Sequence, residues 1–317
     1  MVPLLSLNSN LEQKSLRDGF GEGILELGKQ DERVVTLSAD LSESLSLDEF
    51  KKLFPKRYLE CGIAEQNMLE VAAGLAAVGK IPFACTFGCF WLRAIDQIRV
   101  SVCYSNFNVK LISSHCGLAT GSDGATHQVL EDIAIMRVLP GMNVVTPCDY
   151  EEARKATLAI ASLQAPVYLR LARQKKAVFT TPTTPFIFGK AQIFRTGKDI
   201  TVVANGVLVY EALLAAEKLK GQLDVEVINL STIKPIDRET LIESAKKTGR
   251  VITCEDHQVV GGMGSAVVEV LAEACPVPIK MIGVQDCFGE SGSAEELMQK
   301  YGLSVERIIE EIQKIAR

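Results

Sequence analysis

The chain has 317 residues, of which 47% are hydrophobic and 23% are charged, a balance typical of folded globular proteins and not of disordered ones. The net charge of −5 is spread without long runs of one sign, so neither nucleic acid nor an anionic membrane surface is indicated as a partner. No apolar stretch approaches the length of a membrane span. A chain of this length can form two domains, each with its own buried core.

The first residues and the cysteines bear on the compartment. Residues Met1–Lys14 lack the basic leader and the small-residue cleavage site of a secretory signal. The nine cysteines have irregular spacings, with no CxxC pair and no Cys/His cluster of the metal-binding type. We therefore expect reduced thiols in a cytoplasmic protein.

Short β-rich runs alternate with helical patterns from Val34 to about Arg173. Buried strands are predicted at Val34–Leu37, Pro82–Thr86, Val109–Ser113, Asn143–Val145 and Val167–Leu171. Helices are predicted between them at Glu65–Val78, Phe90–Cys103, Val129–Leu139 and Tyr150–Ser162. This alternation predicts the doubly wound α/β class, a parallel sheet with helices on both faces.

The alternation stops near Gln174 and resumes after Gly189, and the stretch between them is rich in threonine and proline. Beyond it we predict strands at Ile200–Ala204, Val225–Asn229, Arg250–Cys254 and Ile279–Val284. Helices are predicted at Tyr210–Lys220, Arg238–Lys247, Gly264–Ala274 and Ser304–Ile315. The predicted division is a domain at 1–175, a linker at 176–189 and a smaller domain at 190–317.

Two segments in the first half combine a carboxylate with aromatic side chains. Glu65, in GIAEQNM, lies in the first turn of a predicted helix, where a carboxylate already complements the helix dipole. Phe87 and Phe90, in TFGCFWLR, lie three residues apart at the start of another helix and can face one pocket. Core packing is the usual role of such a pair.

Two of the three histidines, His115 and His127, flank Asp123 in the segments SHCG and GSDGATHQ. A His/Asp/His set could bind zinc or iron, and a single histidine is often only structural. Two imidazoles and a carboxylate can also hydrogen-bond to the hydroxyls of a sugar and move protons among them. The residues by themselves leave these alternatives open.

An arginine follows the last strand of the predicted first domain. Arg173 lies in LARQ, and the carboxyl end of a strand in a doubly wound domain faces the ligand crevice. For Arg170 and Arg99 we expect solvated surface charges.

The segments GIAEQNM, TFGCF, SHCG, SDGATH and ARQ, in this order and spacing, resemble transketolases, and the resemblance extends from about Arg17 to the C-terminus. It implies that the cofactor is thiamine diphosphate. Glu65 would meet N1′ of the aminopyrimidine and assist removal of the C2 proton of the cofactor. Phe87 and Phe90 would bracket the pyrimidine, and Leu41 would keep the cofactor bent.

The resemblance also implies how the donor sugar is bound. His115 and His127 would contact the donor and transfer protons, and Asp123 would read the configuration of its hydroxyl group. The family commonly has a glutamate and a proline where this chain has Ser122 and Ala125, and these differences leave His115, Asp123 and His127 in place.

Arg17, Ser44 and Arg173 match the family positions that hold the sugar phosphate. A planar guanidinium suits two-point recognition of phosphate or of a similar tetrahedral anion such as a sulfonate. The implied activity is transfer of a two-carbon ketol unit from a ketose phosphate, or a similar anionic ketose, to an aldose acceptor.

Transketolases hold Mg²⁺ and the diphosphate through a GDG motif and a downstream asparagine in an N-terminal domain, and no GDG occurs in this sequence. The resemblance therefore implies a split enzyme in which an N-terminal partner subunit carries the Mg²⁺ ligands. We expect two copies of each chain in an α2β2 assembly, with no metal ligand on this chain.

Three alternatives to a transketolase remain. A 1-deoxyxylulose-5-phosphate synthase has aspartate in place of the first histidine, whereas this chain has His115. A β-type subunit of a thiamine-dependent 2-oxo acid dehydrogenase needs neither the two histidines nor the two arginines. A non-catalytic paralogue needs none of the residues named above.

The second half contains a further motif, Glu255-Asp256-His257 followed by Gly261-Gly262-Met263-Gly264. A dinucleotide fingerprint would require glycine at the position of Val267, so that interpretation fails. The segment resembles an element of transketolase C-terminal domains that helps assembly, and we expect no active-site role for it.

Overall fold

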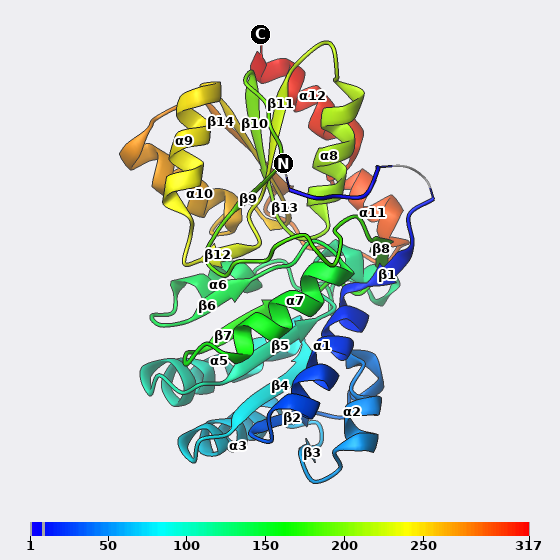
Figure 1. Ribbon diagram of the computed structural model, residues 1–317, viewed down its shortest axis with the longest axis vertical. Coiled ribbons are helices and arrows are strands. Elements are labelled where there is room, and N and C mark those ends of the chain that lie inside the picture. The colour runs from blue at the N-terminus through cyan, green and yellow to red at the C-terminus, as the bar shows by residue number, and fades with distance from the viewer. Residues whose placement is uncertain (1, 8–9, 317) are drawn as a thin grey trace.

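The structure of the chain is a computed structural model that describes residues 2–7 and 10–316. Its strands form a seven-stranded sheet, a five-stranded sheet and a small two-stranded ribbon. The two large sheets lie one above the other along the long axis of the molecule (Figure 1). Among the described residues, no helix has the length and apolar character needed to cross a membrane.

The seven-stranded sheet has the order β12-β6-β7-β5-β4-β2-β3. Its strands are β2 (Val34–Ser38), β3 (Tyr58–Glu60), β4 (Ile81–Phe87), β5 (Lys110–Ser114), β6 (Asn143–Val145), β7 (Val167–Arg170) and β12 (Thr232–Lys234). Every neighbouring pair is parallel except β12 with β6. The central strands are buried on both faces, which explains their runs of apolar and β-branched residues.

Helices cover both faces of this sheet. One face is covered by α1 (Leu16–Gln30), α2 (Asp48–Leu53) and α7 (Tyr150–Ala161), whose apolar side chains join one buried cluster. The other face is covered by α3 (Glu65–Ala77), α6 (Asp132–Val138) and residues 88–104. The helix predicted at Phe90–Cys103 is not continuous. It consists of α4 (Gly88–Trp91), η2 (Leu92–Ala94), α5 (Ile95–Gln97) and the π-helix η3 (Ile98–Tyr104).

The five-stranded sheet has the order β14-β13-β10-β11-β9 and is parallel except for β9. Its strands are β9 (Gln192–Arg195), β10 (Ile200–Ala204), β11 (Val225–Asn229), β13 (Val251–Gln258) and β14 (Ile279–Val284). Its helices are α8 (Leu208–Lys218), α9 (Arg238–Thr248), α10 (Met263–Ala274), α11 (Ala294–Lys300) and α12 (Val305–Ala316). In Figure 1, α9 and α10 lie on one side of this sheet and α8 and α12 on the other.

The two sheets share their apolar packing. Each of the two clusters of buried apolar side chains continues from one face of the first sheet to a face of the second. Strand β12 comes from the second half of the chain but pairs with β6 of the first sheet. The ribbon of β1 (Gln13–Ser15) and β8 (Lys175–Ala177) brings the start of the predicted linker beside the start of α1. The doubly wound α/β class itself is confirmed.

Candidate active site

The predicted site residues follow the carboxyl ends of neighbouring parallel strands. Strands β4, β5 and β7 are adjacent, and Phe87 is the last residue of β4. His115 follows β5 directly, and Arg173 follows β7 after a short turn. Because the carboxyl ends of parallel strands meet at one edge, these side chains gather in the crevice of the sheet.

The two phenylalanines and the two histidines form one aromatic cluster. The ring of Phe87 stacks on that of His115 with 3.6 Å between the centroids. Phe87 and Phe90 stack with 5.5 Å between their centroids, and His127 meets both phenyl rings edge-on. A pyrimidine ring sandwiched between Phe87 and Phe90 needs a wider gap, so in this structure the two phenyl groups form one wall and not two opposing ones.

His115 is held in an unusual conformation. It is buried, and its backbone has a φ of +55°, a region that residues other than glycine rarely adopt. Its Nδ1 lies 2.8 Å from the hydroxyl of Ser114. Burial, followed by the nearby charge of Arg17, lowers the pKa of His115 to about 3. The imidazole is therefore neutral at physiological pH and can both donate and accept a hydrogen bond.

Glu65 begins helix α3 and is 2% exposed. Its Oε2 lies 3.4 Å from Nη1 of Arg93, and the guanidinium of Arg93 also lies over the ring of Phe90, 4.8 Å from the centroid. Sequence reasoning missed Arg93, although it is the last residue of the TFGCFWLR segment. No periodic pattern marks a residue that links a carboxylate and an aromatic ring from two different helices.

Arg17 and Ser44 lie together. Nη1 of Arg17, in helix α1, donates to the backbone oxygen of Ser44 at 2.6 Å. Burial lowers the pKa of Arg17. Ser44 lies in the short helix η1 (Glu43–Leu45), and Leu41, which precedes this helix, is partly buried against the core. The backbone N–H of Leu41 donates to the hydroxyl of Ser38 at 3.0 Å.

Arg173 and Asp123 form an ion pair, with 3.0 Å between Nη1 and Oδ1. The same nitrogen donates to the backbone oxygen of Thr120. Asp123 is the last residue of the helical segment η4 (Leu118–Asp123). A cavity of about 510 Å³ lies beside the pair, and Arg17 and Arg173 both form part of its wall. It is lined by Arg17, Ala119, Thr120, Gly121, Ser122, Arg173, Gln174, Gly292, Ser293 and Ala294.

These groups suit one part of thiamine diphosphate. A buried carboxylate at the start of α3 can bind a ring nitrogen, and the aromatic wall can carry a flat heterocycle. Within residues 2–7 and 10–316, no group of three or more His, Cys, Asp and Glu side chains is placed to hold a metal ion. The carboxylate and the aromatic rings therefore fit the pyrimidine end of the cofactor.

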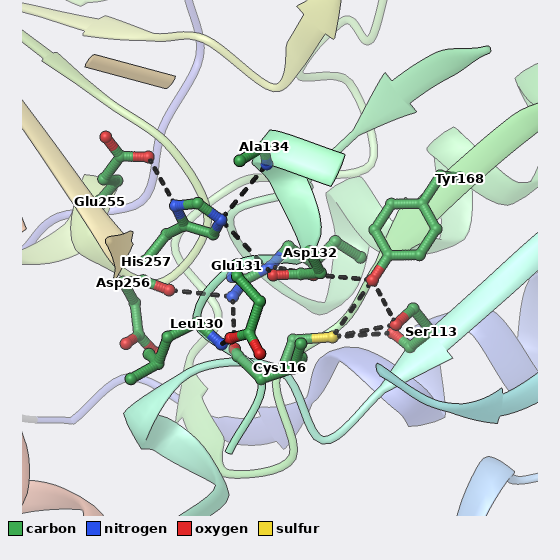
Figure 2. Close-up of polar contacts among 12 residues, drawn as sticks. Ser113, Cys116, Leu130, Glu131, Asp132, Ala134, Tyr168, Glu255, Asp256 and His257 are labelled. Carbon is green, nitrogen blue, oxygen red and sulfur yellow. Dashed lines mark hydrogen bonds and ion pairs between the residues drawn. The ribbon is translucent and has the colours of Figure 1, made fainter. Parts of the chain in front are cut away.

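Arg170 is not the solvated surface charge that we expected, whereas Arg99 is exposed. Arg170 is buried, with its Nε 2.8 Å from Oδ2 of Asp132. The same oxygen accepts from the hydroxyl of Tyr168 at 2.7 Å (Figure 2). The surface interpretation failed because the sequence cannot show that Asp132, almost forty residues earlier in the chain, compensates the buried charge.

The segment Glu255–His257 also differs from its predicted form. Strand β13 does not end at Cys254 but continues through all three ionisable residues to Gln258. All three are buried, and the carboxylate of Asp256 accepts from backbone N–H groups of η4. Sequence reasoning ended the strand early because charged residues break an apolar run.

The chain resembles known proteins along nearly its whole length. The family models of the transketolase pyrimidine-binding domain and the transketolase C-terminal domain match residues 12–177 and 189–308. The 6-deoxy-6-sulfo-D-fructose transketolase subunit of Clostridium sp. strain MSTE9 is 44% identical, over 94% of this chain and 94% of its own length. A subunit of the apulose-4-phosphate transketolase of Phocaeicola vulgatus is 40% identical, over 92% of this chain and 94% of its own.

A solved structure shows that the similarity extends to the fold. It is described as a split gene transketolase in an inactive β4 tetramer and is 44% identical to this chain. The two superpose with a TM-score of 0.90 over 95% of this chain and 98% of the other. Sequence, domain order and fold agree, and the chain is a member of the thiamine-diphosphate-dependent transketolase family.

Proposed function

We propose that this chain is the C-terminal subunit of a split transketolase that transfers a two-carbon ketol unit from an anionic ketose to an aldose acceptor. The observation that carries the proposal is the convergence of His115 and His127 on the phenyl wall. Beside them, Arg173 follows the end of strand β7, forms an ion pair with Asp123 and also lines the adjacent cavity. An aromatic surface, two imidazoles and a cationic cavity match a flat cofactor, a polyhydroxylated donor and its terminal anion, in that order.

The proposed role of Glu65 is to hold a proton at N1′ of the pyrimidine. When bound, thiamine diphosphate supplies the carbon centre that carries the ketol unit. Glu65 suits its task because it is almost fully buried, so water does not compete for the shared proton. Phe87 and Phe90 would support the pyrimidine from one side, and Leu41 would lie against the cofactor from another element.

The proposed role of the two histidines and Asp123 is to handle the hydroxyl groups of the donor. With a pKa of about 3, His115 is neutral at pH 7, so one ring nitrogen can donate a hydrogen bond to a donor hydroxyl and the other can accept one. His127, edge-on to both phenyl rings, would share this task. Asp123 accepts hydrogen bonds only, so it would select a donor hydroxyl placed to donate.

The cavity beside Arg17 and Arg173 would take the terminal anion of the substrate. Two guanidinium groups in one wall favour a tetrahedral oxyanion, and Ser44 would join them. Two relatives are described as acting on a sulfonated and on a phosphorylated sugar. We therefore propose a sugar with a terminal phosphate or sulfonate as the substrate class.

Mg²⁺ and the diphosphate are proposed to bind on an N-terminal partner subunit. The described residues contain no cluster of acidic and histidine side chains for a metal. We propose two copies of each chain, with an active site at each interface between unlike chains.

Reconstitution tests this proposal. The purified chain is assayed with thiamine diphosphate and Mg²⁺, alone and with the N-terminal transketolase subunit of the same organism. Donors carrying a terminal phosphate, a terminal sulfonate or neither are compared. We expect ketol transfer from an anionic donor only when both subunits are present.

Two results would contradict it. Robust turnover by a preparation that contains only this chain, as checked by mass spectrometry, would overturn the split assembly. Decarboxylation of a 2-oxo acid by the reconstituted pair, without ketol transfer, would identify one of the other thiamine-dependent activities.

A further inference from the structure

The end of strand β13 brings three ionisable side chains of the second sheet to the donor-binding loop of the first. Glu255, Asp256 and His257 are each no more than 4% exposed. Burying a charged group is unfavourable unless it is paired or hydrogen-bonded, so the partners of these side chains show what the segment does. The hydrogen-bond partners of the Asp256 carboxylate belong to the loop that follows His115.

The carboxylate of Asp256 binds two successive backbone N–H groups. Leu118 donates to Oδ1 at 2.9 Å, and Ala119 donates to Oδ2 at 3.2 Å. Gly117 completes the contact, because a Cβ atom added there would lie 2.1 Å from Oδ2 of Asp256. With a φ of +79° as well, this position needs glycine for both its conformation and its close approach.

The backbone of Asp256 is fixed from the other side. Nη2 of Arg170 donates to its carbonyl oxygen at 2.9 Å, and the Nε of the same arginine donates to Asp132. The hydroxyl of Tyr168 donates its one proton to Asp132 and lies 2.6 Å from the hydroxyl of Ser113, from which it can accept. The backbone of Asp256 is therefore fixed by a buried hydrogen-bond network formed by side chains of strands β5 and β7.

A second contact from the same half of the chain holds the other end of the loop. Gln128, directly after His127, donates from Nε2 to the backbone oxygens of Gly121 and Glu290, both at 2.9 Å. A Cβ atom at Gly289 would overlap the Oε1 of Gln128 at 1.9 Å. Both ends of the loop between the two histidines are thus tied to segments from beyond residue 250.

We propose that Asp256 is a positioning residue for His115. His115 lies two residues before Gly117, in a left-handed conformation that its surroundings must enforce. By fixing the backbone at 117–119, Asp256 keeps the imidazole stacked on Phe87. The second half of the chain thereby contributes to donor chemistry without touching substrate. The effect on turnover rests on the proposed transketolase activity, and the effect on the loop does not.

The test compares Asp256→Ala with Asp256→Asn and with a matched control. Asp237→Ala also removes a buried aspartate of the second half, one that accepts from the backbone N–H groups of Ala191 and Thr240. Thermal unfolding of all variants checks that they fold. The full chain, with its N-terminal partner, is used throughout.

Two readouts are measured on each variant. The first is the rate at which diethyl pyrocarbonate modifies His115, followed by peptide mass spectrometry with His127 as an internal reference. The second is kcat and KM for ketol transfer.

Asp256→Ala loses two hydrogen bonds to a charged group. We therefore expect the modification rate of His115 to rise, and kcat to fall, by about 10-fold or more. KM for the acceptor should stay within about threefold, because hydrogen bonds to the acceptor are not removed. Asp256→Asn keeps one acceptor oxygen and should recover part of both losses. Asp237→Ala should resemble wild type in both.

The outcomes separate this proposal from the proposed function. If Asp256→Ala changes neither readout, or only one of them, the positioning role is overturned. If it does not fold, Asp256→Asn decides by the same two readouts. If the wild-type complex shows no ketol transfer, the proposed function fails, and the modification rate of His115 still decides whether Asp256 holds the loop.

Discussion

Arg173 holds Asp123 through a hydrogen bond of 3.0 Å, although the two residues were expected to bind different parts of the substrate. The side chains are 38% and 28% exposed, so water screens the pair and the attraction between them is weak. A substrate anion can therefore compete for the guanidinium. Release of Asp123 would then leave its carboxylate free to accept from a donor hydroxyl.

Removal of Arg173 should selectively impair anionic substrates. A hydrogen bond to a charged group contributes about 1.5–3 kcal/mol, so Arg173→Ala should lower kcat/KM for phosphorylated or sulfonated sugars by about 10- to 150-fold. For glycolaldehyde, an acceptor without an anionic group, kcat/KM should fall much less. Steady-state kinetics of the reconstituted complex measures both.

Arg238→Ala is the control for this comparison. Arg238 makes an ion pair with Glu273 on the second half of the chain, and its side chain is 50% exposed. This variant should retain wild-type kinetics with all substrates. An equal loss for glycolaldehyde and for phosphorylated acceptors in Arg173→Ala would contradict the anion role.

Glu65→Gln should fold normally and nearly abolish exchange of the C2 proton of bound thiamine diphosphate. The glutamine keeps the size of the side chain but cannot hold the proton shared with N1′, and general acid–base catalysis is worth about 100-fold or more. Quenched-flow exchange followed by NMR measures the rate in the reconstituted complex. Glu70→Gln, an exposed change on the same helix that keeps an oxygen to accept from Ser101, is the control. An unchanged rate in Glu65→Gln would refute the assignment.

The strands and the order of the site could be predicted from the sequence because both depend on local patterns. Strands β10, β11 and β14 have the bounds that the sequence predicts. Strand ends in a parallel sheet then place Phe87 and His115 together without further information. The division of the chain at 176–189 stays a prediction.

The contacts that the sequence could not give are those between distant charged residues. Arg170 and Asp256 are buried because their partners arrive from other elements, and no window of sequence contains both members. The interruption at residues 88–104 has a similar cause, since a π-helix differs from an α-helix by hydrogen bonds that the apolar pattern does not encode.

The pH dependence of stability should respond in opposite directions to two neighbouring substitutions. Burial raises the pKa of Glu255 to about 7 and lowers that of His257 to about 4. Glu255 binds a proton more tightly in the folded state, so its contribution is full below about pH 4.5 and is lost as the pH rises through 7. His257 binds a proton less tightly when folded, so its contribution is full above about pH 6.5 and is lost as the pH falls toward 4.

In the wild type, these two effects oppose each other between about pH 4.5 and 6.5. Relative to wild type, Glu255→Gln should lose stability as the pH falls from about 6.5, and His257→Gln should gain stability over the same range. Urea unfolding at about pH 7.5, 6.0 and 5.0 provides the comparison. Parallel pH profiles for wild type and both variants would show that neither group changes its protonation on folding.

The chain contains two Arg–Asp pairs of similar length and different burial, which allows the effect of burial on an ion pair to be measured within one protein. Arg170 and Asp132 are 2.8 Å apart and 8% and 1% exposed, whereas Arg173 and Asp123 are 3.0 Å apart and several times more exposed. Loss of one partner leaves an uncompensated buried charge in the first case and a hydrated one in the second. Arg170→Met alone should therefore destabilise the fold by about 3–5 kcal/mol.

A double-mutant cycle for each pair separates the coupling from other losses. With Arg170→Met and Asp132→Asn, the double variant should be about 1.5–3 kcal/mol more stable than the sum of the single changes predicts. With Arg173→Met and Asp123→Asn, the coupling should stay below about 1 kcal/mol. Urea unfolding measures the free energy of unfolding of all six variants. Equal coupling in the two cycles would mean that Asp132 draws its stabilisation from Tyr168 and not from Arg170, and the hydroxyl contact of 2.7 Å would then be the bond to remove by Tyr168→Phe.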